Sequence, residues 1–167
     1  GNAVGFVLDG DNHTISNLEI NGEGMFNMAP ANCVIKNLTI DGATSTSNSH
    51  NAAIFWGGVY SSVNFENVAV KNSTITGNCN VGTFVGGTYE PNNLVVKFKN
   101  CSVEKCALTA NGYESQDPTG ASGFVGKVYG ASKVVFEGKN TIDTATTITN
   151  NNGLVGGQVY GYTTWEN

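Results

Sequence analysis

Large apolar residues beside glycines recur along the chain at regular intervals. Each is a Phe, or a Leu in the last copy, and in four of the five copies one or two glycines follow closely. The markers are Phe26, Phe55, Phe84, Phe124 and Leu154, spaced by 29, 29, 40 and 30 residues. A period of about 30 residues is typical of repeat proteins, in which each unit packs on the next.

A second phrase alternates with the first and is centred on asparagine. Relative to that Asn, apolar residues stand two places before it and one and three places after it. Successive side chains of a β-strand point to opposite faces, so two inward residues three places apart require a bend between them. Asn tolerates the left-handed conformation that such a bend needs. We therefore expect these asparagines to stack above one another at one corner of the fold, as a ladder whose side chains satisfy backbone groups. Its members would be Asn17, Asn37, Asn67 and Asn100.

The two phrases together predict an all-β fold. A unit of about 30 residues cannot bury its own apolar face and must stack on copies of itself. We predict a single domain over residues 1–167, a right-handed parallel β-helix (solenoid) of about five coils with three short strands per coil, and tight bends at the Gly pairs. The expected interior stacks are Phe26, Phe55, Phe84, Phe124 and Leu154; Leu18, Leu38, Val68 and Cys101; and Ile20, Ile40, Val70 and Val103.

Two other β architectures explain the pattern less well. A β-sandwich has strands at a spacing of about 8–12 residues without a common phrase, and a propeller blade has four strands in about 40–50 residues. The one long interval, 84–124, contains turn residues without periodicity, which predicts an inserted loop near 109–122. A shorter polar loop is expected at 44–51. Such insertions often lie on the binding face of a repeat protein.

Several segments resemble a known motif. The phrases Gly-Thr-Phe-Val-Gly-Gly at 82–87 and Gly-Phe-Val-Gly at 123–126 are similar to the GLUG motif, and 6–20 resembles the lead-in coil of bacterial β-helical surface proteins. That motif occurs in adhesin-like proteins and beside some secreted peptidases, many from gut Bacteroidetes. The resemblance implies an extracellular, adhesive module without a catalytic residue. The chain starts abruptly at Gly1, which we interpret as a piece excised from a longer surface protein.

Composition narrows the classes of function. Charged residues make up 13% of the chain, the formal charge is −5, and all eight basic residues are lysines. A nucleic-acid-binding protein normally carries a basic surface with arginines, so no nucleic-acid partner is expected. The chain has no run of about 20 apolar residues, so this segment is not expected to span a membrane. A hydrophobic content of 40% argues against intrinsic disorder.

An enzyme is one alternative, because β-helices host polysaccharide lyases and glycosidases. Lyases of the pectate-lyase type use an arginine base, which this chain lacks. A glycosidase needs two carboxyl groups, and the close pair is Asp9 and Asp11, with Glu19 and Asp41 as candidate partners. We assign these residues to turns and edges, and His13 to a turn, because no nucleophile stands beside it. No catalytic residue, metal or cofactor is predicted.

The cysteines show no metal-binding or redox spacing. None lies in a CxxC pair, and no His stands at ligand spacing from any of them. Cys101 and Cys106 fall on inward positions and are expected to be buried thiols, whereas Cys33 and Cys79 fall near corners. The sequence leaves open whether any of the four forms a disulfide.

Aromatic residues on the outer surface are the candidate binding site. Tyr60, Tyr89 and Tyr129 each follow a marker Phe by five residues and would form a row along the stack. Trp56 follows Phe55 directly and should face outward by alternation. Such a row can stack on sugar rings or anchor a protein partner, or it can be a packing ladder that fills a corner.

The leading hypothesis is a non-enzymatic, extracellular β-helix module of an adhesin-like bacterial protein, on the cell surface or secreted. It would present its loops and the tyrosine row to a host or glycan ligand. The alternatives are a polysaccharide-processing enzyme or its accessory domain, and a structural stalk or spacer. Tyr160, Tyr162 and Trp165 are expected to pack on an adjacent coil, which would allow end-to-end stacking.

Overall fold

The described part of the chain is built from β-strands joined by turns. The computed structural model describes residues 5–27, 29, 31–89, 93–112 and 120–151, and within these ranges it contains no helix. The strands form four sheets, and every strand pair is parallel. The expectation of an all-β fold with parallel strands is confirmed. None of the described residues belongs to a helix able to cross a membrane.

The four sheets differ in size. The seven-stranded sheet has the order β1 (Val7–Ser16), β3 (Cys33–Asp41), β7 (Val63–Lys71), β11 (Val95–Lys99) and β16 (Lys133–Glu137), with β12 (Ser102–Glu104) paired to β7 and β17 (Thr141–Ile142) paired to β12. The five-stranded sheet contains β2 (Glu19–Asn21), β4 (Thr44–Thr46), β8 (Thr74–Gly77), β13 (Ala107–Ala110) and β18 (Thr147–Asn150). Two three-stranded sheets contain β5 (Asn51–Ala52), β9 (Asn80–Gly82) and β14 (Ala121–Ser122), and β6 (Trp56–Val59), β10 (Val85–Thr88) and β15 (Val125–Lys127).

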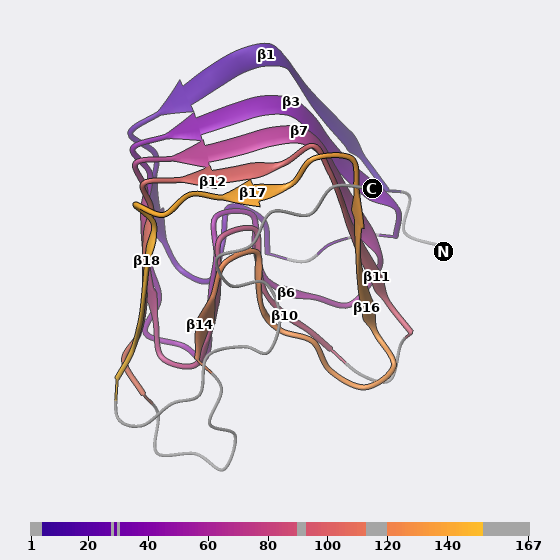
Figure 1. Cartoon of the computed structure of the whole chain (residues 1–167). Coiled ribbons are helices and arrows are strands. Elements are labelled where there is room, and N and C mark those ends of the chain that lie inside the picture. Colours follow the sequence, from indigo (N-terminus) through magenta and orange to yellow (C-terminus); the bar gives the residue numbers. More distant parts are fainter. Residues whose placement is uncertain (1–4, 28, 30, 90–92, 113–119, 152–167) are drawn as a thin grey trace.

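The chain visits the sheets in one order and then returns to the first (Figure 1). The strands β3, β4, β5 and β6 make one pass, and β7, β8, β9 and β10 make the next, each paired with its counterpart. Each of these two passes therefore has four strands and the next has five, β11 to β15, so the expectation of three was wrong. The segments around Phe55, Phe84 and Phe124 each form two short strands, one on either side of the marker, because the chain reverses there (Figure 1).

Asparagines occupy the predicted corners. Asn37, Asn67 and Asn100 have φ values of 50°, 52° and 53°, in the left-handed region that Asn tolerates. Their side chains bond one another: Asn67 Nδ2 donates to Asn37 Oδ1 over 3.1 Å, and Asn100 Nδ2 donates to Asn67 Oδ1 over 3.4 Å. At the far end Asn100 Oδ1 accepts from the backbone of Lys139. The ladder thus joins side chains to side chains and reaches the backbone only at its end.

The first pass is displaced from the predicted alignment. Ile15 pairs with Ile40, Ile20 pairs with Ser45, and the Asn17 amide donates to Asp41, so Asn17 lies at a second corner and outside the ladder. Leu18 and Ile20 consequently leave the two aliphatic stacks to which they were assigned. The cause is a second left-handed position five residues after the first, seen at Asn67 (φ 52°) and Asn72 (φ 47°). Inward apolar residues follow both left-handed corners. The Asn-centred sequence phrase therefore matches either corner, and the alignment of Asn17 with the first corner was wrong.

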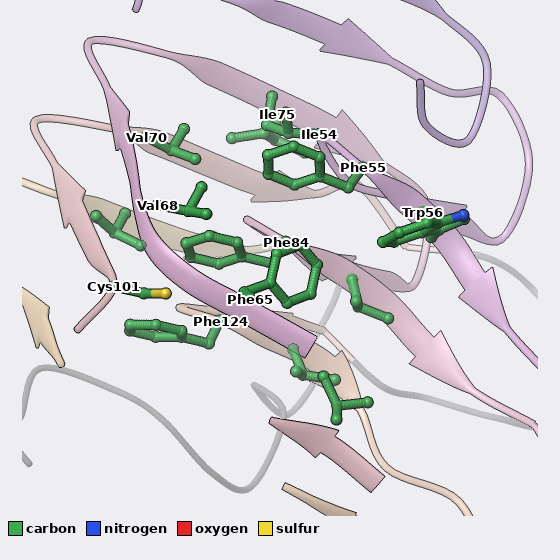
Figure 2. Close-up of a cluster of buried hydrophobic side chains, with 14 of the residues drawn as sticks. Ile54, Phe55, Trp56, Phe65, Val68, Val70, Ile75, Phe84, Cys101 and Phe124 are labelled. Atoms are coloured by element: carbon green, nitrogen blue, oxygen red, sulfur yellow. The ribbon is translucent and has the colours of Figure 1, made fainter. Parts of the chain in front are cut away.

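Two interlocked columns of phenylalanine fill the interior. Figure 2 shows Phe55, Phe84 and Phe124 of one column and Phe65 of the other. The predicted stack is confirmed for three rings: Phe55 and Phe84 lie 5.9 Å apart, and Phe84 and Phe124 lie 5.1 Å apart. A second column, Phe65, Phe98 and Phe136, stacks beside it at 5.1 and 5.5 Å. Rings of one column meet rings of the other edge to face, as Phe84 meets Phe65 and Phe98, the geometry that aromatic quadrupoles favour.

Two aromatic placements differ from the prediction. Phe26 donates its amide to the Phe55 carbonyl and stacks on Trp56 at 5.2 Å, so it lies above Trp56 and outside the Phe column. Trp56 itself has an exposed fraction of 0%, and the expectation that it faces outward as a binding residue was wrong. Because the marker segment reverses inside the stack, both of its faces are covered. Leu154, the last predicted member, lies outside the described residues.

The paired glycines lie in strands and do not form bends. Gly57 and Gly58 belong to β6, and Gly86 and Gly87 belong to β10. A Cβ on Gly86 would lie 2.3 Å from the Gly57 carbonyl oxygen and 2.8 Å from that of Asn80. The glycines therefore allow two strands of the reversed segment to pack backbone against backbone. The prediction that the glycines form tight bends was wrong: they are needed because the backbones of neighbouring strands approach closely.

The predicted loops are shorter than expected. Residues 109–110 belong to β13 and 121–122 to β14, so the insertion lies between these strands, and 113–119 are outside the described residues. The polar segment 44–51 contains β4 and the start of β5. Tyr160, Tyr162 and Trp165 also fall outside the described residues.

Candidate functional site

The three predicted tyrosines form a row along the stack. The rings of Tyr60 and Tyr89 lie 4.7 Å apart with an interplanar angle of 11°, and those of Tyr89 and Tyr129 lie 5.9 Å apart at 12°. The row follows from register, because the tyrosines come directly or shortly after β6, β10 and β15, which pair with one another. Tyr60 is 44% exposed, whereas Tyr89 and Tyr129 are half-buried.

Tyr89 also has a packing role. A Cβ on Gly58 would lie 2.2 Å from Tyr89 Cε2, so the second glycine of the pair leaves room for the ring of the next pass. The Tyr89 hydroxyl accepts a hydrogen bond from Asn51 Nδ2, and burial raises the pKa of the phenol. At the far end of the row Lys127 Nζ lies 4.0 Å from the centre of the Tyr129 ring, a cation–π contact. The middle of the row therefore serves the fold.

A hollow of about 220 Å³ opens at the Tyr60 end of the row, lined by Glu23, Asn27, Gly58, Tyr60 and Tyr89. The Glu23 carboxylate accepts from the Ser49 hydroxyl and lies 3.5 Å from Asn51 Nδ2. The hollow thus combines aromatic carbon with a carboxylate and amide groups. This is the combination that small polar ligands require: an apolar surface for contact and a few polar groups for orientation.

The sequence analysis missed Glu23, Asn27 and Asn51. A usable signal was present for one of them, since Asn51 and Asn80 occupy the same place in successive passes and bond through Asn80 Nδ2 and Asn51 Oδ1 at 2.8 Å. Glu23 and Asn27 flank the first, atypical marker phrase. No periodic partner distinguishes them, and only the folded chain brings them to Tyr60.

Of the acidic residues weighed as catalytic groups, Asp9 and Asp11 share β1, whereas Glu19 and Asp41 lie on other strands. Asp9 is in β1, paired with Lys36 Nζ at 3.0 Å, Glu19 is in β2 of another sheet, and Asp41 ends β3 at the second corner. The Asp11 backbone N–H, the Asn37 amide and Lys36 lower the pKa of Asp9 to about 2.

Two further side chains from that group have structural contacts. Asp41 accepts a hydrogen bond from Asn72 Nδ2 at 2.8 Å. The Nδ1 atom of His13 lies 2.9 Å from the Gly10 carbonyl oxygen, which matches a turn histidine. Across the described ranges, no three His, Cys, Asp or Glu residues are grouped so that they could hold a metal ion.

All four cysteines are buried and none is part of a disulfide. This confirms the inward placement of Cys101 and Cys106. Burial raises the pKa of Cys101 to about 12 and that of Cys106 to about 11. Both remain protonated at neutral pH, and a protonated thiol is a poor nucleophile.

Comparisons of the chain with models of known protein families, with curated proteins and with solved structures found no match.

Proposed function

We propose that this chain is a right-handed parallel β-helix of about five coils and a non-enzymatic, extracellular module of an adhesin-like bacterial protein of the GLUG type. Its support is the parallel pairing of each strand with its counterpart one pass later, which is the pairing that a β-helix requires. The module acts at the bacterial cell surface or after secretion, where it binds a host or glycan ligand.

The hollow beside Tyr60 carries the binding proposal. The C–H face of a sugar ring packs on the exposed Tyr60 side chain, and its hydroxyl groups bond to the Glu23 carboxylate and the Asn27 amide. Tyr89 stacks on Tyr60 and supports its position, whereas Tyr129 stacks on Tyr89 at the far end of the row. Trp56 is no longer a binding residue, because it is buried.

A glycan array probed with the full chain tests this proposal. We expect Tyr60→Ala to weaken binding about tenfold, the loss expected for one aromatic contact of about 1.4 kcal/mol, and Glu23→Gln to weaken it through loss of the charged acceptor. Tyr129→Ala, at the other end of the same row, is the matched control and should retain binding. Undiminished binding by a folded Tyr60→Ala variant would contradict the site.

The structure also supplies an observation for the stalk alternative. Tyr89 fits over Gly58 and bonds to Asn51, so the row has a structural use without any ligand. If the natural chain binds no glycan and no host matrix protein, the stalk becomes the better proposal. A polysaccharide-processing enzyme is disfavoured, because Glu19 lies in a different sheet from Asp9 and Asp41. Asp9 pairs with Lys36 and accepts from Asn37, and Asp41 lies five residues beyond Lys36 along β3.

A further inference from the structure

The outer surface of the five-stranded sheet carries two columns of threonine. In β4, β8, β13 and β18 the middle residue of each Thr-Xaa-Thr-like triplet points inward, and its neighbours on both sides point outward. One column is Thr44, Thr74, Ala107 and Thr147, and the other is Thr46, Thr76, Thr109 and Thr149. We call these eight residues the threonine face; the sheet forms the side of the stack where Figure 1 labels β18.

The register turns the threonine face into a grid. Neighbouring strands lie about 4.8 Å apart, and residues i and i+2 of one strand lie about 6.6 Å apart. Ile75 and Leu108, both 0% exposed, hold the inner side of the sheet. The register of these strands runs without a shift from β4 through β8 and β13 to β18.

The threonine hydroxyls are unpaired within the described part of the protein. No hydrogen bond joins any of the seven side chains to another described group, whereas the buried hydroxyl of Ser45 in β4 donates to the Ala53 carbonyl at 2.9 Å. The four strands also contain no charged and no aromatic residue. The fifth strand of the sheet, β2, continues the two columns with Glu19 beside Thr44 and Asn21 beside Thr46. The grid therefore presents donors, acceptors and methyl groups at regular intervals, with one carboxylate at its edge.

These features select among possible partners. A mineral, a nucleic acid or a lipid surface requires several charged side chains, and the outer side of this sheet carries one, Glu19, at its edge. A protein partner requires aromatic or large aliphatic anchors, and a sugar chain requires aromatic rings. A neutral partner whose own donors and acceptors repeat in two directions satisfies the grid, and ice is such a partner.

We propose that the threonine face binds the surface of an ice crystal. Each hydroxyl joins the hydrogen-bond network of the ice surface, and each methyl group lies in a hollow between water molecules. Single contacts are weak, but they act together because the rigid grid presents all of them at once. The site is separate from the hollow beside Tyr60 and does not depend on glycan binding.

Thermal hysteresis and partition of the full chain into slowly growing ice test the proposal. We expect the natural chain to show thermal hysteresis and to concentrate in the ice. The Thr76→Tyr variant, changed at the centre of the face, should show at least tenfold less hysteresis. Thr39→Tyr, on the outer side of the seven-stranded sheet, is the matched control and should behave as the natural chain. Tyr60→Ala should also leave ice binding unchanged. Should Thr76→Tyr fail to fold, Thr74→Lys provides the same test at an exposed position.

Three results would overturn the proposal. The first is a natural chain that enters ice no more than serum albumin does. The second is a folded Thr76→Tyr or Thr74→Lys variant with full hysteresis, or an equal loss in Thr39→Tyr. The third is adsorption to crystalline chitin or cellulose through Thr74 and Thr76 without adsorption to ice, which would assign the face to a polysaccharide surface.

Discussion

In both the seven-stranded and the five-stranded sheet, parallel strands place equivalent residues of successive passes side by side. The polar side chains on the outer sides of the two sheets nevertheless interact differently. On the seven-stranded sheet, polar groups bond one another from pass to pass. One column contains Asp9, Lys36, Glu66, Lys99 and Glu137 in register, with signs that alternate. Its ion pairs include Lys36 with Asp9 at 3.0 Å and Lys99 with Glu66 at 2.9 Å. On the threonine face, by contrast, the described side chains bond to no other described residue.

The difference shows what an in-register parallel stack requires of a polar side chain. Residues at equivalent positions become neighbours at about 4.8 Å. Like charges at that distance destabilise the sheet, so a charged column must alternate in sign. Threonine is neutral and can repeat without penalty. A charged column therefore satisfies itself, whereas a threonine column leaves its hydroxyl groups available for a partner.

The largest expected effect on stability concerns the Asn ladder of the seven-stranded sheet. Asn67→Ala should lower the free energy of unfolding by about 2 kcal/mol, because Ala disfavours the left-handed conformation and two amide hydrogen bonds are lost. Asn67→Gly keeps the conformation accessible and should cost about half as much. Urea denaturation of both variants measures the two contributions. Equal losses would show that the backbone conformation contributes little.

A pH dependence should mark the same sheet. The pKa of Asp9 is lowered to about 2 in the folded state, so its carboxylate contributes stability above about pH 4 that is lost as the pH falls through about 2. Acid unfolding followed by circular dichroism should show this loss, and Asp9→Asn should remove part of it.

Salt separates the causes of the Asp9 effect. The hydrogen bond from the Asp11 backbone is the largest cause, ahead of Lys36, so the pH dependence should persist in about 1 M salt, where exposed ion pairs are screened. Disappearance of the effect in salt would assign it to Lys36 instead.

The smallest expected effect belongs to the threonine face. Thr74→Val removes an exposed hydroxyl that has no partner among the described residues and keeps the β-branched shape that suits a strand. The free energy of unfolding should change by less than about 0.5 kcal/mol. A loss as large as that of Asn67→Ala would mean that the threonine hydroxyls stabilise the fold and that the contrast between the two faces is false.

Periodic residues were predicted well, and local exceptions were not. The corners at Asn37, Asn67 and Asn100, the stack from Phe55 to Phe124 and the tyrosine row follow from spacing alone, because register converts equal spacing into contact. Asn17 was misplaced because two corners five residues apart carry the same signal. Trp56 was misplaced because alternation assumes that one side of a strand faces solvent, and the reversed segment has no such side.

The amino-acid sequence by itself determined the parallel repeat, its corners and the residues that line its interior, since these depend on a period that is visible without coordinates. Tertiary structure alone decided which surfaces remain available. It brought Glu23 and Asn27 to Tyr60, covered both sides of the Gly-Gly strands, and aligned threonines from four separate passes into one grid. Each of these depends on which residue of one pass lies beside which residue of the next, and a shift of one residue would turn the threonines inward.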